Sequence, residues 1–167
     1  RLSVRIFVES RAEPDRRDQV AAIVEYIRSR IQNLDIAITH TRVDANMIVT
    51  LLHDRDLDQT IRTIYGAERA RNIERSLRPQ CLAGFAKDES YRIMRSEVLL
   101  VVDEGDFVFR DCAYEEILQA LGPINDDRTV PWSMFNDDVS MGFFDIYDQI
   151  LLNLLYDPRI LPGMTKE

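Results

Sequence analysis

The strongest constraint on the fold is a nearly continuous apolar run at residues 46–52, with the sequence NMIVTLL. A strand with water on one face alternates apolar and polar side chains, whereas this run is apolar at successive positions. Such a run is typical of an interior strand in a sheet whose two faces are both covered. We therefore expect residues 46–52 to form an interior strand.

The periodicity of the other segments predicts further strands and helices on both sides of this run. The other strands are expected where apolar and β-branched residues recur, over residues 2–8, 35–39 and 91–102. Helices are expected where apolar residues share one face, over residues 13–32, 107–121 and 140–156. The charged segment 54–79 predicts one or two exposed helices broken near Gly66. This order predicts a single α/β or α+β domain over residues 1–167.

The charge of the chain argues against two kinds of environment. It has 29 acidic and 21 basic residues, a net charge of −8, and no extended basic cluster. No nucleic-acid partner is therefore expected, because nucleic-acid binding needs a concentrated basic surface. No apolar run approaches the roughly 18 residues of a membrane span, so no transmembrane segment is expected. Phosphate-binding glycine loops and a GxSxG nucleophile are also missing, and no cofactor is expected.

The segment 115–125, EEILQALGPIN, is the most informative motif. In its simplest interpretation it is the buried face of a helix that Gly122 ends, with a solvated pair of glutamates. The spacing resembles the HExxHxxGxxH motif of metzincin-type zinc peptidases, in which two ligands lie one helical turn apart and Glu activates a metal-bound water. The resemblance places Glu116 at the position of the base. It places Glu115, Gln119 and Asn125 at the three ligand positions.

A second stretch extends this resemblance. Metzincin-type peptidases have a Met-containing turn after the third ligand, and Ser133 and Met134 stand at a suitable distance for such a turn. A final helix then follows, as is expected here over residues 140–156. The resemblance implies a zincin-like domain: a mixed twisted sheet, an early long helix, a degenerate active-site helix and a C-terminal helix.

The chemistry of the three ligand positions argues against zinc. None of them is His, and zinc prefers imidazole and thiolate to neutral amide oxygen. His40 and His53 are isolated and lie far upstream in the sequence.

The leading hypothesis is therefore a non-catalytic binding or scaffolding module with a protein or peptide partner and no bound metal. The competing hypothesis is a hydrolase with unusual Glu, Gln and Asn ligands and Glu116 as base. A harder cation held with the help of Asp126 or Asp127 is a third alternative.

The two cysteines, Cys81 and Cys112, do not have the spacing of a zinc site. The residues alone leave two alternatives open: two free thiols or one disulfide.

The chain also resembles an uncharacterised family of bacterial putative lipoproteins. The shared runs are CxxEExxQALGxxND at 112–126, SxFND within 133–138, and LLYDPRIxPGM at 154–164. This resemblance implies export to the periplasm, or to the membrane as a lipid-anchored protein, in a Gram-negative bacterium. It therefore favours a Cys81–Cys112 disulfide, because oxidation persists outside the cytosol.

The sequence also leads to expectations about the two ends of the chain. The chain begins with Arg1 rather than Met, so a leader, with a possible lipid anchor, is expected upstream. Ile160 and Leu161 are expected to fold back on the domain. The segment 165–167 is typical of a helix start, so the natural protein is expected to continue beyond Glu167.

Overall fold

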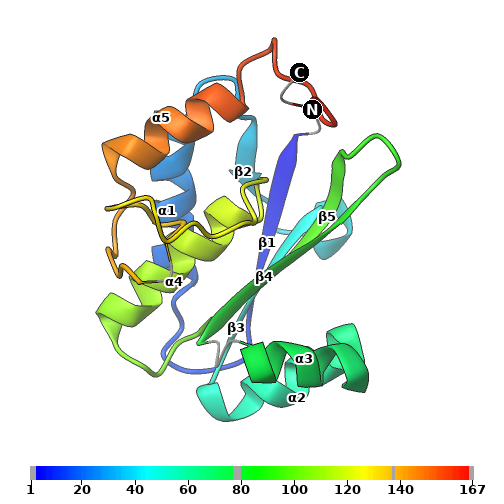
Figure 1. Ribbon diagram of the computed structural model, residues 1–167. Helices are drawn as coiled ribbons and strands as arrows, with labels where there is room; N and C mark the ends of the chain where they lie inside the picture. The colour runs from blue at the N-terminus through cyan, green and yellow to red at the C-terminus, as the bar shows by residue number, and fades with distance from the viewer. Residues whose placement is uncertain (1–2, 77–79, 137, 166–167) are drawn as a thin grey trace.

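The computed structural model describes residues 3–76, 80–136 and 138–165 (Figure 1). Within these residues the chain forms a five-stranded sheet with the order β2-β1-β3-β5-β4. The parallel strands are β1 (Val4–Ser10), β2 (Ile36–Ile38), β3 (Met47–Leu52) and β5 (Ile93–Val101). Strand β4 (Cys81–Lys87) is antiparallel to β5. The predicted mixed α/β class is confirmed, whereas the expected helix start at 165–167 lies largely outside the described residues.

The apolar run at residues 46–52 occupies the centre of the sheet, as predicted. Strand β3 pairs with β1 on one side and with β5 on the other, and all six of its residues are buried. Burial on both faces explains why polar residues do not alternate along this strand. The most constraining local signal in the sequence is therefore also the centre of the core.

Helices cover the two faces of the sheet unequally (Figure 1). The larger core lies under α1 (Arg17–Arg30), α4 (Asp106–Gln119) and α5 (Ile146–Leu155). The smaller core lies under α2 (Asp54–Tyr65) and α3 (Ala67–Ser76) on the other face. A short 3-10 helix, η1 (Arg42–Asp44), precedes β3. Among the described residues, every helix is too short or too polar to cross a bilayer.

The sequence did not predict strand β4. Its central residues Ala83, Gly84 and Ala86 are small, so the strand shows no clear alternation of apolar and polar side chains. The close approach of another residue explains the glycine, because a Cβ atom at Gly84 would overlap the hydroxyl oxygen of Tyr65. The burial of β4 therefore depends on residues that are distant in the sequence.

The C-terminal helix is shorter than the predicted range of 140–156. Asp111 of α4 accepts hydrogen bonds from the backbone N–H groups of Met141 (2.8 Å) and Gly142 (2.9 Å). Gly142 also has φ = 62°, a left-handed conformation that glycine adopts without strain. The chain is therefore held in a turn here, and α5 begins only at Ile146.

Two other expectations about the helices and the chain end are confirmed. The charged segment forms two helices, α2 and α3, which are separated at Gly66. Ile160 and Leu161 fold back on the domain, where they line a cavity together with the start of β1.

Candidate functional site

Helix α4 carries the residues that resemble a zinc-peptidase motif. Glu116 and Gln119 are buried, and Glu115 is partly exposed. The side-chain amide of Gln119 donates a hydrogen bond of 2.9 Å to Asp126 Oδ1 and a longer one of 3.5 Å to Glu115 Oε1. Asn125, the third expected ligand position, is exposed. The structure therefore brings Glu115 and Gln119 together with Asp126, the neighbour of the expected residue.

This donor set does not suit zinc. It offers carboxylate and amide oxygens, and the amide N–H group of Gln119 is directed at Asp126. Within the described residues, no three His, Cys, Asp or Glu side chains come together as a possible metal site.

The two histidines lie elsewhere in the fold. His53 Nδ1 lies 3.2 Å from Asp103 Oδ2, just before α4 begins, whereas Gln119 ends that helix about 20 Å further along its axis. His40 is exposed in the segment after β2. His53 is therefore too far from Gln119 to supply the missing imidazole, and no possible metal site among the described residues includes His40.

Ser133 and Met134, expected in a Met-containing turn, are buried and hydrogen-bonded to Asp148 of α5. The Ser133 hydroxyl donates to Asp148 Oδ1 (2.7 Å), and the Met134 N–H donates to Asp148 Oδ2 (2.9 Å). Asp148 is fully buried, and burial raises the pKa of its carboxyl. Sequence reasoning missed Asp148, although a lone carboxylate on a strongly apolar helix was a visible signal.

The disulfide between Cys81 and Cys112 is confirmed. It joins the edge strand β4 to α4, one turn of helix before Glu115 and Glu116. The motif helix is thereby fixed to the edge of the sheet. Two residues that the sequence left ambiguous thus become part of the frame of the site.

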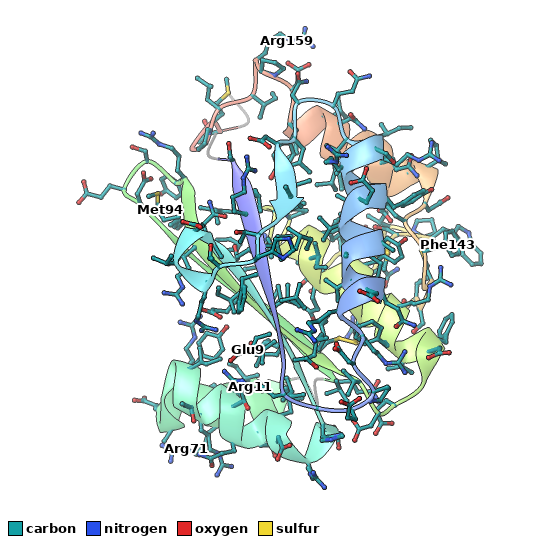
Figure 2. All side chains as sticks on the ribbon, turned by 180° about the vertical axis from the view of Figure 1, so that it is seen from behind. Glu9, Arg11, Arg71, Met94, Phe143 and Arg159 are labelled. Atoms are coloured by element: carbon teal, nitrogen blue, oxygen red, sulfur yellow. A yellow bond between two sulfur atoms is a disulfide. The ribbon has the colours of Figure 1, made fainter. Side chains whose placement is uncertain are left out.

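A cavity of about 420 Å³ lies beyond the C-terminal end of α4, and the sequence did not indicate it. Its walls come from the starts of β1 and β3, the β4–β5 hairpin, the residues after α4, the end of α5 and the segment 160–164. Most of the lining is apolar, and several apolar residues at its mouth are exposed: Tyr91, Met94, Ile124, Leu161 and Met164. Figure 2 shows Met94 at the hairpin end of the sheet, where the C-terminal segment passes. Glu115, Glu116 and Gln119 do not line this cavity.

Helix α5 has a second apolar surface. Its outward positions are apolar and at least one-third exposed: Ile146, Tyr147, Ile150, Leu151 and Leu154. Phe143, just before the helix, is also exposed and lies on the side of the molecule opposite Met94 (Figure 2). Contiguous apolar surface of this kind is a feature of interaction sites.

Comparison with known proteins identifies a family for this chain but no activity. The family model described as "Protein of unknown function (DUF2927)" matches residues 1–167. No curated protein matches the chain significantly.

Proposed function

We propose that this chain, which belongs to the DUF2927 family of proteins of unknown function, is a non-catalytic binding module for a small apolar ligand. Membership shows only that the chain belongs to a family of unknown function, as expected, and it supplies no activity. The proposal therefore rests on one observation, the cavity beyond α4 with its apolar lining.

The size and chemistry of the cavity support this function. Ligand sites in proteins are mostly apolar hollows of about 300–1,000 Å³, and 420 Å³ lies within that range. A chain of about ten carbon atoms would gain about 0.8 kcal/mol for each buried methylene group, or about 8 kcal/mol in total. The cost of association offsets part of this gain, so the expected dissociation constant is micromolar or weaker.

A hydrolase that uses Glu116 as base has less support. It needs a metal at Glu115, Gln119 and Asn125, but Asn125 is exposed and the Gln119 amide donates to Asp126. The zincin-like architecture itself remains a proposal. Its support is the order of α4, the buried Ser133–Met134 turn and α5.

We expect protein purified without chelator to contain well below one zinc ion per chain, because imidazole and thiolate ligands are missing from α4. Elemental analysis by mass spectrometry measures this directly. A variant with histidine at the two helix positions beside Asp126 (Glu115→His and Gln119→His) is the positive control for zinc uptake. Near-stoichiometric zinc in the natural chain, lost in Gln119→Ala, would revive the hydrolase hypothesis.

We also propose that the protein is exported and stays in the periplasm or is anchored to a membrane by a lipid. The Cys81–Cys112 disulfide supports this proposal, because disulfides persist in oxidising compartments. A protein or peptide partner remains a prediction, and the outward face of α5 is the surface that we expect it to contact.

We expect Ile124→Trp to weaken ligand binding at least about tenfold, because a bulky indole at the mouth removes apolar volume from the cavity. Binding is measured by titration calorimetry with decanol, a neutral alcohol whose ten-carbon chain fits the cavity. Val43→Trp is the matched control, since Val43 lies on η1, is 90% exposed and does not line the cavity. Equal decanol binding by the two variants, or no decanol binding by the natural chain, would contradict the proposed function.

A further inference from the structure

We infer that the ligand of this cavity is a single-chain amphiphile with an anionic head group, held by Lys87 and Arg92. This inference rests on the proposed function and adds the chemical class of the ligand. It depends on the charges that line the cavity and on which polar groups remain available to a ligand.

The charges at the cavity are opposite to the charge of the whole chain. Acidic residues outnumber basic ones by 29 to 21, yet among the described residues the cavity lining contains Lys87 and Arg92 and neither Asp nor Glu. Both cations belong to the β4–β5 hairpin and its turn, at one side of the mouth. Arg92 is paired with Asp88, which does not line the cavity, so the described charges that face the cavity are positive and attract an anion.

Three other polar side chains of the lining are occupied by the protein itself, and one of them is Tyr156, whose hydroxyl donates to the Leu121 carbonyl (3.0 Å). Asn46 accepts a hydrogen bond from the Arg5 N–H (2.8 Å) and donates one to the Ser3 carbonyl (2.7 Å). The Ser96 hydroxyl donates to the Ala120 carbonyl (3.1 Å). The inner wall is therefore suited to an apolar chain, and the cations at the hairpin are charged groups suited to an anionic head group.

The hairpin holds its two cations in defined places. Asp88 fixes the turn by accepting the backbone N–H groups of Ser90 (2.8 Å) and Arg92 (2.9 Å). The Lys87 ammonium lies 4.0 Å from the centre of the Tyr91 ring, and Arg92 Nε lies 3.5 Å from Asp88 Oδ2. Lys87 has no carboxylate partner among the described side chains, so its N–H donors are available to an anion.

The volume limits the length of the apolar tail. A heavy atom at liquid density takes about 30 Å³, so incomplete filling of 420 Å³ leaves room for about ten carbon atoms. The tail would lie against Phe85, Leu121 and Leu155, under the segment 160–164, with the head group at the hairpin. Decanoate matches both requirements.

Titration calorimetry with three probes that share a ten-carbon chain tests the charge of the head group. We expect decanoate to bind more tightly than decanol, and decyltrimethylammonium to bind most weakly. Lys87→Glu should weaken decanoate binding about tenfold and leave decanol binding unchanged, because only the charged head group meets the reversed charge. Arg55→Glu is the matched control, since Arg55 is exposed on α2, away from the cavity, and the change in net charge is the same.

The possible results separate this inference from the proposed function. Equal affinity for decanoate and decanol, with no effect of Lys87→Glu, would overturn the head-group inference and leave the apolar binding module intact. Binding of none of the three probes would overturn both. Flotation with phosphatidylglycerol vesicles tests whether a two-chain membrane lipid is the ligand instead. Decanoate binding without flotation supports a single-chain amphiphile, whereas Lys87-dependent flotation without decanoate binding would overturn the inference.

Discussion

Replacing Cys81 and Cys112 together by alanine is expected to lower the free energy of unfolding by about 3–4 kcal/mol. The disulfide joins residues 31 positions apart. It stabilises the fold because the cross-link lowers the conformational entropy of the unfolded chain. It also holds the edge strand β4, whose small side chains bury little apolar surface, against α4. Urea denaturation followed by circular dichroism measures the change.

Chemical reduction provides an independent control for this variant. Reduced natural protein, kept in dithiothreitol after unfolding, should show nearly the same loss as the double alanine variant. Because Phe85 and Lys87 of β4 line the cavity, both forms should also bind decanol more weakly. A loss of less than about 1 kcal/mol in both forms would mean that β4 is held by its pairing with β5 alone.

The same strand shows what the sequence could not reveal about the fold. Strand β3 was predictable because burial on both faces leaves a local signal, an unbroken apolar run. Strand β4 was not predictable, because Gly84 is small to make room for Tyr65 and Cys81 is bonded to α4. These causes are contacts between distant segments, and they leave no periodicity in the strand itself.

The candidate sites differ in the same way. The motif on α4 and the Ser133–Met134 turn depend on short spacings, which can be found by counting along the chain. The cavity is assembled from segments between Val4 and Met164, and each contributes only a few ordinary apolar residues. Its two cations became significant only when the fold placed them beside an apolar hollow. The sequence therefore indicated a degenerate metal site, whereas the fold reveals a cavity at a different place, which the sequence did not indicate.

Asp148→Ala is expected to lower the free energy of unfolding by about 3 kcal/mol, a large effect for one side chain. The carboxylate accepts hydrogen bonds from the Ser133 hydroxyl and the Met134 N–H, and both donors are buried. Removing it leaves two buried donors without their acceptor, at a cost of about 1–3 kcal/mol each. Urea denaturation measures the loss. Asp145→Ala, one residue before α5, is the control and should have a much smaller effect.

The pH dependence of stability tests the same carboxyl group without removing its volume. Burial raises the pKa of Asp148 above its ordinary value of 3.8, so the folded state keeps a proton that the unfolded state has lost. Stability therefore falls as the pH rises from about 3.8 through the raised pKa of the folded state, and the loss is constant above it.

The side chain of the Asp148→Asn variant cannot ionise, so the natural chain should lose stability relative to this variant over that interval. Urea denaturation of both proteins at a series of pH values measures the difference. A difference that does not change with pH would show that Asp148 ionises equally in the folded and unfolded states, and that burial does not govern this carboxyl.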